Sequence, residues 1–162
     1  MWSALGPADA SVRSEYEIKA AFLYNFTRFI TWNEAPAEVT ELTLCVFGKN
    51  PFGDVLAGLD GRVSQGRTLR LAFPQSLSET DRCQVLFVGN AKARNLPSIT
   101  EYARAQNMLT ISEIPDFVDE GGIIGYVKEG NVIRFEINLT AAQQAGLHIN
   151  SRLLELALRV IR

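Results

Sequence analysis

Apolar residues recur along this chain with two different periods, and the alternation of these periods predicts an α/β fold. From Ser14 to Ile30 they return every three or four positions, which is the spacing of an amphipathic helix of about four turns. Ser14 is expected to cap the first turn, because a serine side chain accepts hydrogen bonds from the free backbone N–H groups there. The predicted buried face consists of Ile18, Phe22, Phe26, Phe29 and Ile30.

Short apolar runs that end at turn residues predict the strands. These runs are residues 42–47, 67–73, 85–88 and 108–111. Two further runs, residues 123–128 and 132–137, flank a Glu-Gly-Asn turn and predict a hairpin near the C-terminus. The other helical segments are predicted at residues 51–59, 98–105, 140–145 and 152–161, with a single turn after Ser112.

Strands that alternate with helices are typical of an α/β domain. We expect a single compact domain with a central mixed, mostly parallel sheet flanked by helices and an antiparallel hairpin at one end. Residues 14–162 are assigned to this domain, and residues 1–13 to an N-terminal extension or a signal-peptide remnant. Within the latter, Ala8-Asp9-Ala10 has the small-residue pattern of a cleavage site, without the basic segment and long apolar core of a complete signal peptide.

The charge balance narrows the classes of partner. The 162 residues include 16 Lys and Arg against 18 Asp and Glu, and no basic run occurs. A nucleic-acid binder normally presents a clustered basic face, so we expect no nucleic-acid partner. No run of about 18 apolar residues occurs either, so we expect no direct insertion into a membrane.

Candidate catalytic chemistry is sparse. The only histidine, His148, lies in the link between the last two predicted helices, and no partner motif accompanies it. We interpret it as a surface or capping imidazole and predict that the protein is not an enzyme.

One acidic cluster surrounds the predicted single turn and comprises Glu113, Asp116, Asp119 and Glu120. Its spacing differs from the alternating oxygen ligands of a calcium loop. We interpret it as a solvated, acid-rich first turn, and we expect neither a metal nor a cofactor.

Two glycine corners offer the alternative of a small-ligand site. Gly48 and Gly89 each follow a predicted strand and precede a helical segment, which is where open α/β sheets bind ligands. Neither a G-x-G-x-x-G sequence nor a phosphate-binding P-loop is present. A small-ligand-binding sensor module using this crevice is therefore the second hypothesis for function.

The two cysteines lie in apolar strand-like runs. Cys45 belongs to the run at 42–47, and Cys83 opens the run that leads to 85–88. Neighbouring strands are about 4.8 Å apart, which is close enough for a disulfide. From the residues alone, a bridge and two buried free thiols remain equally open, since cysteine is often buried without pairing.

The second hairpin strand is amphipathic and offers a surface for a protein partner. Its apolar positions, Ile133, Phe135 and Ile137, alternate with polar ones. We predict that Arg134, Glu136 and Asn138 contact a partner protein; the alternative is a solvated strand face.

Several stretches, taken in order, resemble the YfiR-type family of secreted bacterial regulators. They are residues 17–26, Cys45-Val46-Phe47-Gly48 with Pro51-Phe52-Gly53, Gly66-Arg67, residues 83–88, 109–112, 121–124, 134–138, and 146–154. The resemblance runs from about Glu15 to the C-terminus.

The resemblance implies a periplasmic repressor that binds the periplasmic sensor domain of a membrane-anchored diguanylate cyclase and holds it inactive. An OmpA-like outer-membrane lipoprotein is expected to sequester the repressor, so that cyclic-di-GMP rises and biofilm formation follows. It also implies a homodimer and an oxidised cysteine pair, which matches Cys45 and Cys83. A second cysteine pair found in some relatives is missing from this sequence.

Overall fold

The computed structural model describes residues 7–33 and 39–162. Its four α-helices are α1 (Pro7–Phe29), α2 (Leu96–Ala105), α3 (Leu139–Gln144) and α4 (Ser151–Leu156), and its short 3₁₀ helices are η1 (Val55–Leu59), η2 (Leu77–Arg82), η3 (Asn90–Asn95) and η4 (Phe117–Glu120). The strands are β1 (Ile30–Trp32), β2 (Glu41–Phe47), β3 (Val63–Ser64), β4 (Arg67–Ala72), β5 (Val85–Val88), β6 (Leu109–Ser112), β7 (Ile124–Glu129), β8 (Val132–Asn138), β9 (Leu147–Ile149) and β10 (Arg159–Ile161).

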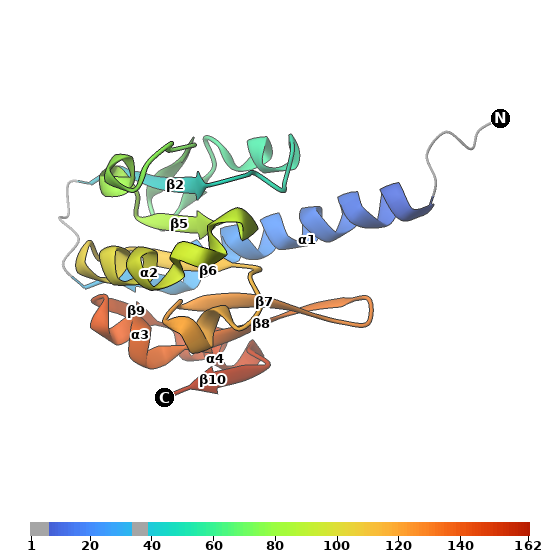
Figure 1. The fold of residues 1–162 in the computed structure, drawn as a ribbon. Helices are drawn as coiled ribbons and strands as arrows, with labels where there is room; N and C mark the ends of the chain where they lie inside the picture. The colour runs from blue at the N-terminus through green and yellow to red at the C-terminus, as the bar shows by residue number, and fades with distance from the viewer. Residues whose placement is uncertain (1–6, 34–38) are drawn as a thin grey trace.

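One eight-stranded sheet organises these elements, in the order β10-β8-β7-β6-β5-β2-β4-β3 (Figure 1). The neighbouring strands β4, β2, β5, β6 and β7 run parallel to one another. β8 is antiparallel to β7, and β10 is parallel to β8. The predicted mixed, mostly parallel sheet with an antiparallel hairpin is therefore confirmed. A separate ribbon pairs β1 with β9.

The order in which strands are added to the sheet reverses between β2 and β5. The chain passes from β2 to β4 on one side and then returns to β5 on the other side of β2. Gly48 and Gly89 follow the carboxyl ends of these two strands, at the topological switch point where open α/β sheets bind ligands.

Strand alternation divides the core between the two faces of the sheet. On β2, Leu44 and Val46 pack with Leu23 and Phe26 of α1, all at most 1% exposed. Cys45 of the same strand packs on the other face, in the cluster that includes α2. The long helix α1 thus covers one face and α2 the other.

The first helix was predicted to begin at Ser14, but α1 begins at Pro7, so Ser14 lies inside the helix and does not cap it. Proline suits the first helical position, because the N–H that it lacks would have no helical partner there. Ile18, predicted to be buried, is 45% exposed.

Two other helix predictions are wrong in part. Residues 51–59 contain only the short η1. At the C-terminus, the helix predicted for 152–161 ends at Leu156, because Ala157 is extended and the chain enters β10, which covers the edge of β8. The described residues include no helix that is both long and apolar enough to cross a membrane.

Candidate functional site

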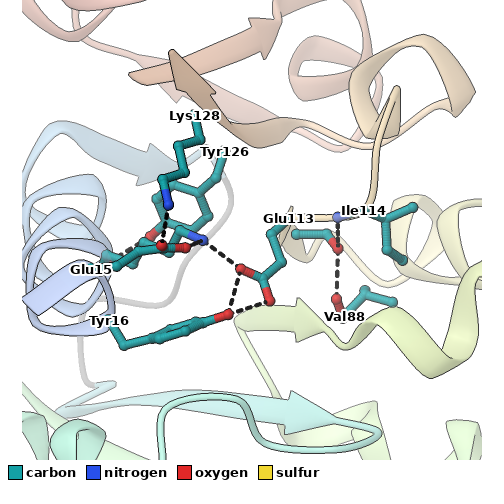
Figure 2. A network of polar contacts seen from close by, with 9 residues as sticks. Glu15, Tyr16, Val88, Glu113, Ile114, Tyr126 and Lys128 are labelled. Atoms are coloured by element: carbon teal, nitrogen blue, oxygen red, sulfur yellow. Dashed lines mark hydrogen bonds and ion pairs between the residues drawn. The ribbon is translucent and has the colours of Figure 1, made fainter. Parts of the chain in front are cut away.

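A lysine is buried where α1 passes the carboxyl end of the sheet. The Lys19 residue is 5% exposed. Its Nζ lies 2.7 Å from Oε2 of Glu15 and 2.5 Å from Oε1 of Glu113 (Figure 2). Glu15 is one helical turn away, whereas Glu113 directly follows β6. Because a buried ammonium is stable only when it is paired, these two carboxylates fix α1 against the sheet.

The turn that carries Glu113 is itself held by hydrogen bonds. The Ser112 hydroxyl donates to the Val88 carbonyl at 2.6 Å and accepts from the Ile114 N–H at 3.0 Å (Figure 2). The Tyr16 hydroxyl donates to both carboxylate oxygens of Glu113, at 3.1 and 3.0 Å. The Glu113 carboxylate is therefore held from two sides.

The hairpin closes the network. The Tyr126 hydroxyl donates to the backbone carbonyl of Lys19 at 2.6 Å, and the Lys128 Nζ lies 3.0 Å from Oε1 of Glu15. Two carboxylates and two ammonium groups thus neutralise one another. We call Glu15, Tyr16, Lys19, Glu113, Tyr126 and Lys128 the Lys19 network.

The electrostatics of the Lys19 network keep its phenols neutral and its helical carboxylate charged. Burial, followed by the negative charge of Glu113, raises the pKa of Tyr16 and of Tyr126 well above the usual range. Burial also raises the pKa of Glu15, but the hydrogen bonds and charges of Lys19 and Lys128 outweigh it, so the pKa of Glu15 is lowered overall.

A cavity of about 320 Å³ opens beside the Lys19 network. Its lining includes Asn90, Pro115 and Val127 together with five members of the network: Tyr16, Lys19, Glu113, Tyr126 and Lys128. The cavity therefore joins the ends of β5 and β6 to the projecting hairpin. Its charged groups already compensate one another, so it suits an uncharged polar group better than an ion.

At the predicted glycine crevice, the two glycines have little free space for a side chain. A Cβ on Gly89 would lie 2.8 Å from the Lys49 carbonyl oxygen, and one on Gly48 would lie 3.1 Å from Cγ of Lys92. The two corners are thus in tight contact with neighbouring chain. Asn90, directly after Gly89, lines the cavity of about 320 Å³.

The structure joins Cys45 and Cys83 in a disulfide, with their Cα atoms 5.9 Å apart. Cys45 belongs to β2, and Cys83 ends η2 just before β5. Both side chains are buried, at 0% and 3% exposure. The bridge therefore links β2 to the segment that leads into β5.

The structure separates the predicted acidic cluster. The Glu113 side chain is only 10% exposed and belongs to the Lys19 network, so its interpretation as a solvated carboxylate is wrong. Asp119 instead lies 2.9 Å from Arg159 of β10, and this contact lowers the pKa of Asp119. In residues 7–33 and 39–162, no group of three or more His, Cys, Asp or Glu side chains is arranged to hold a metal.

His148 lies between α3 and α4, as predicted, in a link that forms a short strand. It belongs to β9, where it pairs with Thr31 of β1, and its side chain is exposed.

The three predicted partner contacts have different environments. Arg134 is ion-paired with Glu129 at 3.5 Å. Glu136 binds Arg159 at 3.0 Å, and β10, which carries Arg159, pairs with β8 along its outer edge. Asn138 caps α3 through the Ala141 N–H and donates to the Val118 carbonyl, so its polar atoms hold the fold together.

Sequence reasoning missed the Lys19 network. Glu15 and Lys19 are four residues apart, a spacing that is common for solvated surface pairs on helices. The useful signal was a polar pair on a helix otherwise rich in large apolar residues. Glu113 is 94 positions from Lys19, and no local pattern connects the two.

Comparisons with known proteins agree with this fold. A family model described as YfiR/HmsC-like matches residues 16–158, and no curated protein matches the chain. A conserved domain protein from Vibrio cholerae O1 biovar El Tor str. N16961 has a TM-score of 0.59 and 13% identity, over 90% of this chain and 60% of its own. The ABC domain in complex with L-Trp from Streptococcus pneumoniae has a TM-score of 0.53 and 14% identity, over 74% of this chain and 55% of its own.

The chain spans less than two thirds of either solved structure. At 13% and 14% identity, these likenesses concern the fold alone.

Proposed function

We propose, because the chain belongs to the YfiR/HmsC-like family, that the protein is a non-enzymatic regulator of the bacterial periplasm. It binds the periplasmic sensor domain of a membrane-anchored diguanylate cyclase and represses cyclic-di-GMP synthesis. An OmpA-like outer-membrane lipoprotein sequesters it and relieves the repression, which promotes biofilm formation. The match of the family model over residues 16–158 is the observation that carries this proposal.

Two structural features support the compartment and the mode of action. The buried Cys45–Cys83 disulfide suits an oxidising compartment such as the periplasm. The ionisable groups of the Lys19 network are compensated internally, which suits a rigid binding protein better than a catalyst. Repression requires the regulator to prefer the inactive cyclase, and a shift from 99:1 to 1:99 needs about 5.5 kcal/mol of such preference.

The test is reconstitution with purified components. The oxidised chain is mixed with a full-length diguanylate cyclase from its source organism in nanodiscs, and cyclic-di-GMP production is measured with and without the periplasmic domain of the lipoprotein. We expect the chain to suppress production and the lipoprotein to restore it. Unchanged production at saturating chain would contradict the proposal, and light scattering of the same sample tests the proposed homodimer.

A small-ligand sensor is the second candidate function. The cavity beside Asn90 lies next to the topological switch point, where open α/β sheets bind ligands. The solved S. pneumoniae neighbour is described as a complex with L-Trp. Calorimetric titration with free amino acids is the direct test, and a measurable heat that disappears in Asn90→Trp, which fills the cavity, is the result this candidate requires.

A further inference from the structure

The hairpin strand β7 continues past the strand that pairs with it on its inner side. β6 pairs with β7 only as far as Ser112 and Gly125, whereas β8 accompanies β7 to Glu129. In the described part of the chain, residues 126–129 therefore pair on one side only. At about 3.4 Å per residue, they form an open edge about 13 Å long, and Figure 1 shows the hairpin projecting beyond the sheet beside α1.

The direction of the main-chain groups along this edge follows from one hydrogen bond. The Phe135 carbonyl accepts from the Leu158 N–H at 2.8 Å, so it points away from β7. Phe135 lies opposite Tyr126, and in an antiparallel pair the hydrogen-bonding direction alternates at every residue. Lys128, two residues on, therefore directs its N–H and C=O to the open edge, while Val127 and Glu129 bond to β8.

The cavity of about 320 Å³ follows this edge. Its lining contains Tyr126, Val127 and Lys128 from the edge, and Pro115 from the loop after β6. Pro115 has no N–H to donate, so this loop does not extend the sheet beside Lys128. The cavity thus occupies the place of a neighbouring strand.

The side chain of Lys128 leaves the edge accessible. Lysine on an edge strand commonly deters pairing with another chain. Here its ammonium lies 3.0 Å from Glu15, so the side chain is drawn toward α1 (Figure 2).

We propose that this edge receives an extended segment of a protein partner, which adds to β7 as a further strand. The inference rests on the proposed function, because it names the surface by which the regulator holds the periplasmic domain of the cyclase. The segment supplies a main-chain donor and an acceptor to Lys128. Because Glu15, Lys19 and Glu113 already neutralise one another with Lys128, the side chain that enters the cavity is uncharged.

A matched pair of variants isolates the backbone contribution. Lys128→Ala removes the side chain and keeps the N–H, whereas Lys128→Pro removes both. The Lys128 N–H is not used within the hairpin, so proline is compatible with the fold at this edge position. In titrations with the purified periplasmic domain of the cyclase, we expect Lys128→Pro to bind at least about tenfold more weakly than Lys128→Ala.

Amide hydrogen exchange of the wild-type complex provides a second measurement that does not depend on the folding of Lys128→Pro. We expect the exchange of the Lys128 amide to slow on binding, because the added strand accepts its hydrogen bond. Equal affinity of the two variants together with unchanged exchange overturns this inference and leaves the proposed function standing. Failure of the wild-type chain to bind the cyclase domain overturns both. Loss of a wild-type dimer in Lys128→Pro, with partner binding retained, assigns the edge to a second copy and overturns the inference as well.

Discussion

At the residue scale, Lys19 is a buried lysine that is paired with two carboxylates. Its side chain is 6% exposed and forms ion pairs with Glu15 and Glu113, whose side chains are 18% and 10% exposed. Removing one partner of a buried ion pair costs far more than the pair contributes, because the remaining charges keep their desolvation penalty. The Lys19 network therefore fixes α1 chiefly by being costly to disrupt.

We predict that Lys19→Ala lowers the free energy of unfolding by about 3–5 kcal/mol, since it leaves the largely buried Glu113 carboxylate without its cation. The double variant Lys19→Met/Glu113→Gln removes both charges and is expected to lose less than half as much. Urea unfolding followed by circular dichroism measures both. A double variant that is less stable than Lys19→Ala would contradict this account.

The pKa of Tyr16 predicts a loss of stability in alkali. Because its pKa in the folded protein lies above the ordinary value of 10.0, the neutral phenol stabilises the fold fully below pH 10, and this contribution is lost as the pH rises beyond that value. We expect the free energy of unfolding to fall less steeply above pH 10 in Tyr16→Phe than in the wild-type chain. Denaturant unfolding at a series of pH values is the measurement; identical slopes for the two proteins are the contrary result.

The contacts of Lys19 and Glu113 could not be predicted from the sequence. The helical pattern around Lys19 indicates a turn-to-turn pair with Glu15, and the local composition around Glu113 indicates a solvated acidic turn. Only the tertiary contact between them, 94 positions apart, changes both interpretations.

At the element scale, the sequence was informative wherever a run was long enough to show a period. The apolar runs placed β2, β4, β5, β6 and both hairpin strands, and the helix at 98–105 corresponds to α2. The three-residue strands β1, β9 and β10 were missed, because three residues show no period. At β10, pairing with the free edge of β8 overrode the helical pattern of the last segment.

The disulfide is expected to stabilise the arrangement of β2 and β5. It closes a loop with a sequence separation of 38, for which the chain-entropy model gives a contribution of about 4 kcal/mol. We predict a loss of that size in Cys45→Ser/Cys83→Ser, measured by urea unfolding under non-reducing conditions. Intact-mass measurement after alkylation serves as the control on the wild-type chain, and two alkylated thiols in protein purified from the periplasm would count against the bridge.

At the scale of the whole molecule, the mixed, mostly parallel sheet and the family were both predictable, because each depends on the order of many short segments. The intramolecular neighbours of the predicted contact residues were not predictable. Of the predicted contact residues, Arg134 pairs with Glu129 of the same hairpin, Glu136 pairs with Arg159 of β10, and Asn138 caps a helix. A strand's sequence reports which side chains face away from the core, but not which neighbouring strand covers them.

The prediction that Glu136 contributes to partner binding is therefore tested against its structural role. Glu136→Lys reverses a charge that is 17% exposed and breaks its pair with Arg159, so we expect slower association with the cyclase domain or the lipoprotein and an altered salt dependence. Glu136→Gln removes the charge without reversing it and is the matched control, expected to have a smaller effect on the same rate. Phe135→Ala leaves a cavity in the core and is expected to lower the free energy of unfolding by about 3–5 kcal/mol. It is therefore the control for a substitution that acts through stability. Surface plasmon resonance at several salt concentrations, paired with urea unfolding, separates these effects; wild-type association rates in Glu136→Lys would show that this face of β8 is solvated and that partners dock elsewhere.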